Sequence, residues 1–160
     1  MSFDLAHRFP LVAFHWAVRR GRLDRERLGW LGECHVARLA RKRGWRVLGR
    51  RLVLPAGEVD LLLRWQQVPV LVEVKSALVP DGWTLPGGAP WSEEIRPGRH
   101  FDARQWRAYE RAARQVRRRL ETESQGPVRI DLVEVLWHPR WRRPVVCCTT
   151  GICTAQDADG

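Results

Sequence analysis

The stretch GEVDLLLRWQQVPVLVEVK, residues 57–75, decides the fold, because it predicts two apolar strands joined by a short turn. Val and Leu dominate the runs 58–65 and 69–75, and Gln66-Gln67 separates them. Runs of this composition around a two-residue connection are typical of a β-hairpin. A turn that is symmetric about Gln66-Gln67 places Asp60 opposite Glu73 and Glu58 opposite Lys75.

Side chains alternate along a strand, so Glu58, Asp60, Glu73 and Lys75 share one face of this hairpin, and the other face is apolar. Opposed Cβ atoms on one face lie about 5 Å apart. Two carboxylates at that separation repel, and one of them takes up a proton unless a cation lies between them. The pattern therefore predicts that Asp60 and Glu73 bind Mg²⁺ or Mn²⁺, with further oxygen ligands from a carbonyl and waters.

Lys75 is one of only two lysines in a chain with 26 arginines. Lysine, unlike arginine, can give up its proton when it is buried. An ammonium on an apolar strand is costly unless it is paired or lies beside bound anions. We expect Lys75 to orient a water or to neutralise charge on a phosphate. The alternative is a ladder of ion pairs that faces solvent, with Glu58 bound to Lys75.

A helix is predicted over residues 25–43, with Gly44 as its C-terminal stop. Glu33 shares one side of this helix with Gly29, Ala37 and Ala40. Small residues allow a helix to approach a sheet closely, so Glu33 is a candidate third carboxylate of the cluster. The alternative is an ordinary glutamate that interacts with the helix dipole.

The remaining pattern predicts an α/β fold with a mixed sheet flanked by helices, in the order α-β-β-β-α-β. Residues 1–24 form an extra segment with a surface helix near 11–18, residues 25–150 form one domain, and residues 151–160 form a tail. The other regular elements are predicted at 46–54, 102–121, 128–137 and, as a shorter last strand, 144–149. The Pro-, Gly- and Trp-rich stretch 76–100 lacks periodicity and predicts a long loop that is functional or disordered.

Lys and Arg number 28 against 18 acidic residues, a net charge of +10, which favours a polyanionic partner. The second helix carries Arg107, Arg111, Arg114 and Arg118 at helical spacing, a basic ridge suited to phosphates. A solvated helix face is the alternative. Trp83 and Trp91, in the long loop, could stack on unpaired bases or could pack the loop onto the domain.

Other classes of protein find less support in the sequence. No apolar run approaches the length of a membrane span, so no membrane partner is expected. The cysteines lack the paired spacing of a zinc site, which favours a reducing, cytoplasmic compartment. No Gly-rich loop of the nucleotide-binding kind occurs.

Five motifs occur in a fixed order and carry a family resemblance. They are Gly29-x-x-Gly32-Glu33-x-x-x-Ala37, Gly44-Trp45-Arg46-Val47-Leu48, Gly57-Glu58-Val59-Asp60-Leu61-Leu62, Val72-Glu73-Val74-Lys75 and Val128-Arg129-Ile130-Asp131-Leu132-Val133. Over residues 25–137 the chain resembles the uncharacterised YraN-like family of bacterial proteins. That resemblance implies the restriction-endonuclease-like, PD-(D/E)xK fold of archaeal Holliday-junction resolvases, and by analogy a homodimer.

The resemblance implies a role for each acidic residue and for the lysine. Glu33 would be the acid on the helix, Asp60 and Glu73 the metal-binding acids, and Lys75 the catalytic lysine. The chain departs from the family in Ser76-Ala77-Leu78, in a longer connection to the second helix and in its Trp-bearing N-terminal segment. Arg104 also stands where the family tends to have a lysine. These departures concern substrate handling rather than the acids and Lys75.

Two functions from different classes follow. The first is a Mg²⁺-dependent endonuclease that selects branched, nicked or partly single-stranded DNA, with Glu33 acting through a water and Glu58 supporting the site. The second is a non-catalytic module that binds nucleic acid or recruits a partner on the same fold. A factor that processes folded RNA is a lesser third option.

Overall fold

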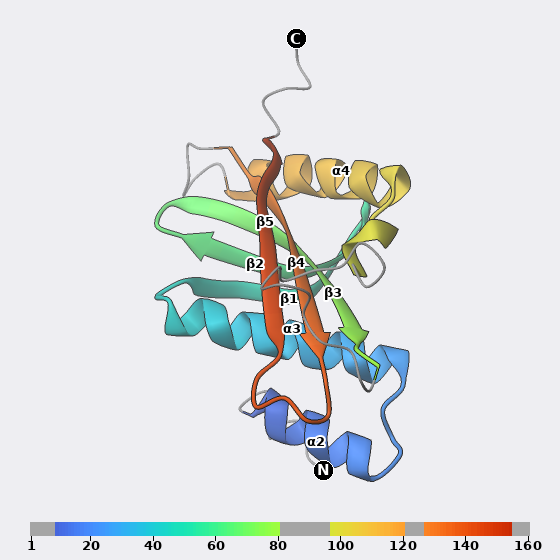
Figure 1. Cartoon of the computed structure of the whole chain (residues 1–160). Coiled ribbons are helices and arrows are strands. Elements are labelled where there is room, and N and C mark those ends of the chain that lie inside the picture. Colours follow the sequence, from blue (N-terminus) through green and yellow to red (C-terminus); the bar gives the residue numbers. More distant parts are fainter. Residues whose placement is uncertain (1–8, 81–96, 121–126, 155–160) are drawn as a thin grey trace.

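The computed structural model describes residues 9–80, 97–120 and 127–154. It confirms the predicted α/β class and the order α-β-β-β-α-β, followed by the predicted last strand (Figure 1). The helices are α2 (Pro10–Arg19), α3 (Arg25–Lys42) and α4 (Ala103–Leu120), with a 3-10 helix η3 (Pro97–His100) before α4. The strands are β1 (Arg46–Leu54), β2 (Gly57–Trp65), β3 (Val68–Leu78), β4 (Arg129–Trp137) and β5 (Val145–Thr154).

The five strands form one mixed sheet in the order β1-β2-β3-β4-β5. Sequential neighbours pair antiparallel except β3 and β4, which are parallel. A parallel pair needs a crossover, and α4 lies within that connection. Helix α3 covers one face of the sheet and α4 covers the other (Figure 1).

Both faces of the central strands β2, β3 and β4 are therefore largely buried, and each face has its own apolar core. Val70 and Val72 of β3 pack in the core beneath α3, whereas Leu71 packs with Tyr109 and Ala113 of α4. Successive side chains of β3 point to opposite faces and so enter both cores. A strand that is buried on both faces needs apolar residues at every position, which explains why β3 is a continuous apolar run.

The N-terminal helix is more deeply integrated than the predicted surface helix near 11–18. Pro10, Ala13, Phe14 and Ala17 of α2 are buried. The Phe14 ring is fully buried against Trp137 at the end of β4, with ring centroids 4.8 Å apart. The helix exposes Val12 on its other side, and its buried side could not be predicted locally because Trp137, the partner of Phe14, lies far along the chain.

Two strands are longer than the sequence predicts. Strand β3 continues to Leu78 because its residues 76–78 pair with Val135, Leu136 and Trp137 of β4. Strand β5 reaches Thr154, opposite Arg129, so the expected tail from residue 151 begins inside the sheet. Both extensions depend on a neighbouring strand rather than on local propensity. Trp83 and Trp91 of the predicted loop lie outside the described residues.

Candidate active site

The hairpin register confirms the symmetric turn, but only as far as the acidic cluster. Opposed pairs run from Trp65–Val68 to Leu61–Val72, where the β2–β3 ladder ends. Beyond this pair, the Asp60 carboxylate serves as the hydrogen-bond partner of β3. Its Oδ2 accepts a hydrogen bond from the Val74 N–H at 2.7 Å. A side chain has therefore replaced the neighbouring strand as the partner of the β3 backbone.

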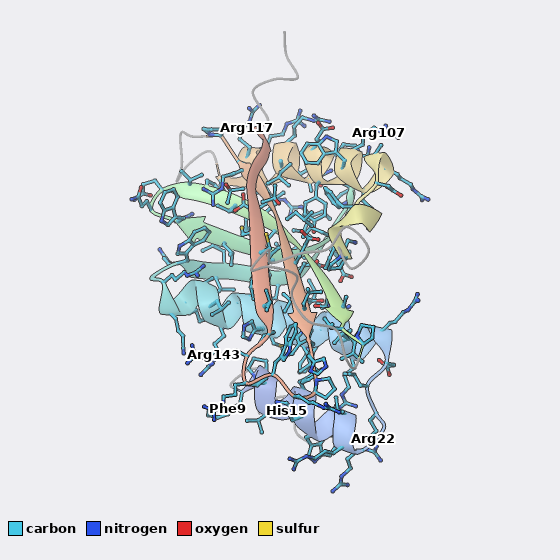
Figure 2. All side chains as sticks on the ribbon, viewed as in Figure 1. Phe9, His15, Arg22, Arg107, Arg117 and Arg143 are labelled. Atoms are coloured by element: carbon cyan, nitrogen blue, oxygen red, sulfur yellow. The ribbon has the colours of Figure 1, made fainter. Side chains whose placement is uncertain are left out.

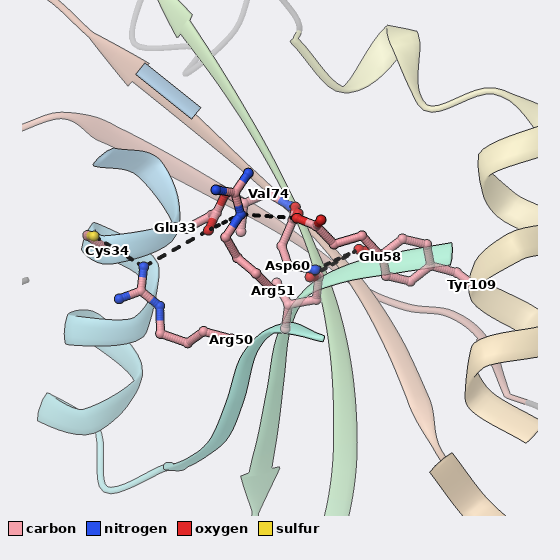
Figure 3. Close-up of polar contacts among 9 residues, drawn as sticks. Glu33, Cys34, Arg50, Arg51, Glu58, Asp60, Val74 and Tyr109 are labelled. Carbon is pink, nitrogen blue, oxygen red and sulfur yellow. Dashed lines mark hydrogen bonds and ion pairs between the residues drawn. The ribbon is translucent and has the colours of Figure 1, made fainter. Parts of the chain in front are cut away.

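The predicted pairing of Glu58 with Lys75 is wrong. Glu58 lies opposite Val53 of β1, and its Oε1 is 3.0 Å from Nε of Arg51 (Figure 3). Because β2 remains paired with β1 after it leaves β3, the end of β2 turns its acidic side chain toward β1. Glu58 therefore contacts the candidate site through Arg51 rather than through Lys75.

The effect of Glu73 on the pKa of Asp60 supports the prediction that these two carboxylates lie close together. Burial raises the pKa of Asp60 to about 7, and the Glu73 carboxylate adds to this rise. The bond from Val74 N–H and the Lys75 ammonium act in the opposite direction on the same pKa. Asp60 is therefore partly protonated at neutral pH, as expected for a buried acid beside a second carboxylate.

Lys75 connects the acid pair to α4. Its Nζ lies 2.6 Å from Oε1 of Glu73 and donates to Oε1 of Gln105, at the start of α4, at 3.4 Å. Glu73 is buried, whereas about a fifth of the Lys75 side chain is exposed (21%). The ammonium thus lies at the boundary between the acids and solvent.

Glu33 is buried on the side of α3 that faces the sheet. Burial raises the pKa of Glu33, and Arg51 and Arg50 counteract that rise at 3.8 and 4.0 Å from its Oε2. The close approach of α3 depends on Gly32, where a Cβ atom would overlap Oγ of Ser76 on β3. Gly32 therefore allows the close approach that brings Glu33 to the cluster, whereas a Cβ atom on Gly29, of the predicted small-residue side, would meet no atom within 4 Å (Figure 3).

Two residues that the sequence interpretation did not assign to the site belong to its geometry. Arg51 contacts both Glu33 and Glu58, and it does so from a left-handed backbone with φ of 46°. Tyr109 of α4 accepts the Asp60 N–H at 3.3 Å and donates to the Val72 carbonyl at 3.4 Å. Its signal in the sequence is that it is the chain's single tyrosine, on the apolar side of the helix.

The acids fit a hard cation that keeps much of its own hydration. Within the described residues no three His, Cys, Asp or Glu side chains form a ready metal cage. Asp60 uses Oδ2 for Val74, which leaves Oδ1 for an ion beside Glu73. Mg²⁺ is commonly held by one or two carboxylates together with waters and substrate phosphates. Asp60 and Glu73 are the residues of this site that could hold such an ion.

A basic surface adjoins this cluster on α4. Arg107, Arg111 and Arg118 of the predicted ridge are exposed, and Arg114 is half-buried. Figure 2 shows Arg107 and Arg117 projecting outward from α4. An open pocket of about 580 Å³ lies between Lys75 and the start of α4, and Arg104 and Arg111 help to line it.

The structure also bears on the expectation about membranes. Across residues 9–80, 97–120 and 127–154, no helix combines the length and apolar character required to cross a bilayer.

Comparison with known proteins finds one family. The model of the uncharacterised protein family UPF0102 matches residues 32–135, a range that contains the acids, Lys75 and Tyr109. A UPF0102 protein of Parvibaculum lavamentivorans is 34% identical over 131 residues, which cover 79% of this chain and 87% of the relative. A UPF0102 protein of Prochlorococcus marinus (strain MIT 9303) is 44% identical over 54 residues, or 34% of this chain and 43% of the relative. A UPF0102 protein of Sphingopyxis alaskensis is 39% identical over 59 residues, or 37% of this chain and 44% of that relative.

Proposed function

The chain belongs to the uncharacterised UPF0102, or YraN-like, family, and we propose that it is a Mg²⁺-dependent, structure-selective DNA endonuclease. The observation that carries the proposal is the acid pair. Asp60, with a pKa of about 7 beside Glu73, is poised to exchange its proton for a cation, and Lys75 Nζ lies 2.6 Å from Glu73. Mn²⁺ would substitute for Mg²⁺ at an all-oxygen site of this kind.

Asp60 and Glu73 would hold the ion, and the rest of the site would handle the phosphate. When bound, the ion would polarise a phosphoryl oxygen and lower the pKa of a coordinated water. Lys75, which spans from Glu73 to Gln105, would orient the attacking water or donate to the phosphate oxygen that gains charge. Glu33 would accept a hydrogen bond from a water in the same cluster, and Arg51 opposes the rise that burial causes in the pKa of Glu33.

Several residues would support this arrangement without touching the phosphate. Tyr109 and the Asp60–Val74 bond fix the point at which β2 and β3 separate, and so fix the direction of the Asp60 carboxylate. Glu58 holds Arg51 through its ion pair. Positioning of this kind matters because a displacement of about 1 Å in a catalytic group can cost roughly a hundredfold in rate.

DNA is the proposed substrate because the surface beside the acids is basic. The arginines of α4 offer charge to a sugar–phosphate backbone, and such contacts position DNA without reading its sequence. Selection of branched, nicked or distorted DNA is therefore favoured over selection of a base sequence.

The second candidate, a nucleic-acid-binding module without turnover, has one observation in its favour. Lys75 already neutralises Glu73, and the described residues contain no cluster of three potential metal ligands. Such a module would bind DNA through α4 with strong salt dependence and would leave the acid pair without a catalytic task.

Calorimetric titration with Mg²⁺ and Mn²⁺, followed by a cleavage screen over forks, flaps, nicked duplexes and four-way junctions, separates the two. Asp60→Asn is the matched control for metal binding, because an amide oxygen can still accept the Val74 N–H. Lys75→Ala is the control for cleavage. We expect metal-dependent incision by the unaltered protein and loss of incision in both variants. Salt-sensitive DNA binding without metal binding or incision would instead establish the non-catalytic module.

A further inference from the structure

The open pocket at the start of α4 has walls from three separate elements. Lys75 contributes from β3, Ala56 from the turn between β1 and β2, and the rest come from α4 and the residue before it. The lining residues are Ala56, Lys75, Asp102, Arg104, Gln105, Ala108 and Arg111. Lys75 is also the ion-pair partner of Glu73, so the pocket opens directly beside the candidate catalytic cluster.

Two arginines make the pocket cationic, while Lys75 is paired with Glu73 and Asp102 adds one negative charge to the lining. Arg104 and Arg111 are seven residues apart on α4, so both side chains lie on the side of the helix that lines the pocket. Both residues are exposed, and within the described part of the chain neither guanidinium forms an ion pair. The acidic residue of the lining, Asp102, is engaged with the backbone, where its Oδ1 accepts from the N–H groups of Arg104 and Gln105 at 2.9 and 2.8 Å.

Part of the pocket lining is small and apolar. Ala108 lies between the two arginines in the sequence, four residues after Arg104, and Ala56 of the turn is the other alanine of the lining. Alanine at both positions leaves room above the helix that a larger side chain would fill. A volume of about 580 Å³ lies within the range of pockets that take a small ligand, on the order of 300–1,000 Å³.

A pocket lined by cationic side chains and by small apolar ones matches the chemistry of a single nucleotide, which has an anionic phosphate and a flat base. The phosphate would lie among Arg104, Arg111 and Lys75, and the base would lie over the alanines. A paired base is stacked inside its duplex and cannot enter a pocket of this size, whereas an unpaired nucleotide is free to turn out of the strand.

We infer that this pocket binds the phosphate and base of one unpaired nucleotide next to the bond to be cleaved. The inference rests on the proposed function, since it deepens that function by naming the feature of DNA that the site selects. Single-stranded flanks, such as those at flaps and forks, supply such a nucleotide, whereas a blunt duplex does not.

Binding measured without metal tests the pocket independently of catalysis. Fluorescence anisotropy in EDTA would compare a labelled blunt hairpin duplex with the same duplex carrying a four-nucleotide single-stranded overhang, using Asp60→Asn protein to prevent turnover. We expect the overhang to bind about tenfold more tightly, the size of effect that one base contact commonly contributes. Competition by thymidine monophosphate but not by thymidine would show that the phosphate is required.

Variants then assign the preference to the pocket. In the same protein, Arg104→Gln, Arg111→Gln and the charge-neutral, pocket-filling Ala108→Leu should each reduce the overhang preference to about threefold or less. Arg119→Gln removes an equal charge from the same helix outside the pocket and should leave the ratio unchanged. Melting temperatures would show that each variant is folded.

Equal binding of blunt and overhanging DNA by the Asp60→Asn protein would overturn the inference. A loss of overhang preference in Arg119→Gln as large as in the pocket variants would also overturn it. Neither result depends on cleavage. If the overhang preference behaves as expected but no substrate is ever incised, then the nuclease proposal fails and the pocket stands.

Discussion

Asp60 and Val74 are hydrogen-bonded where β2 and β3 separate, with the Val74 N–H 2.7 Å from Oδ2 of Asp60. The ladder between the two strands ends at Leu61 and Val72, which are one residue from Asp60 and two residues from Val74. The carboxylate that would hold a metal ion therefore also satisfies a backbone donor of β3, on a stretch that is otherwise buried. One side chain thus combines a structural role with the proposed chemical role, and matched substitutions can separate the two.

The Asp60–Val74 bond predicts different costs for Asp60→Ala and Asp60→Asn. Both variants remove the charge beside Glu73, but only alanine leaves the Val74 N–H without its acceptor. Leaving a buried donor unpaired costs about 1–3 kcal/mol, so the alanine variant should have the lower free energy of unfolding by that amount. Urea denaturation at pH 7 measures the difference. Equal stabilities would mean that water replaces the carboxylate at this position.

The raised pKa of Asp60 predicts how stability depends on pH. The folded protein holds this proton up to about pH 7, whereas an unperturbed aspartate releases it near 3.8. Between these values the folded state binds more protons than the unfolded state, so the free energy of unfolding should fall as pH rises from about 4 to about 7. Above that window the Asp60 contribution should be constant.

Two variants identify the source of this pH dependence. Asp60→Asn should flatten the fall between pH 4 and 7, and Glu33→Gln should flatten it in part, because burial also raises the pKa of Glu33. Urea denaturation at a series of pH values provides the measurement. A profile that is identical in the unaltered protein and in Asp60→Asn would contradict the assignment to Asp60.

The left-handed backbone of Arg51 predicts an unusual preference for glycine within a strand. Arg51→Gly and Arg51→Ala both remove the ion pairs to Glu33 and Glu58, but only glycine adopts a φ of 46° without steric cost. The glycine variant should be the more stable of the two by about 1 kcal/mol. The same pair of substitutions at the neighbouring Arg50, which is not in the left-handed region, should show the opposite order. Thermal or urea unfolding of the four proteins would settle the comparison.

The contact between Gly32 and Ser76 predicts a coupled pair of substitutions. Gly32→Ala alone should destabilise the protein by about 1–3 kcal/mol, because the new methyl group would meet the Ser76 hydroxyl and force α3 away from β3. In a Ser76→Ala background the nearest Ser76 atom that remains is Cβ, 3.3 Å from the added carbon, so the penalty should shrink. A double-mutant cycle measures the coupling, which should exceed about 0.5 kcal/mol. Additive effects would show that the helix does not need this close approach.

The sequence alone determined the features that depend on local spacing. A two-residue connection at Gln66-Gln67 fixes the hairpin register, and a period of two then assigns Asp60 and Glu73 to one face. A helical period brings Gly32 and Glu33 to the side of α3 that faces the sheet. These relations join residues that are near in sequence or related by one turn, so few alternatives compete.

The tertiary structure alone decided which side chains meet across elements. Glu58 pairs with Arg51 because β2 follows β1 after it leaves β3, and Tyr109 reaches Asp60 because α4 packs over that gap. Phe14 is buried because it packs against the ring of Trp137, the last residue of β4. Such contacts are set by how twisted strands and packed helices fit together in space, and the periodicity of a single segment does not contain that information.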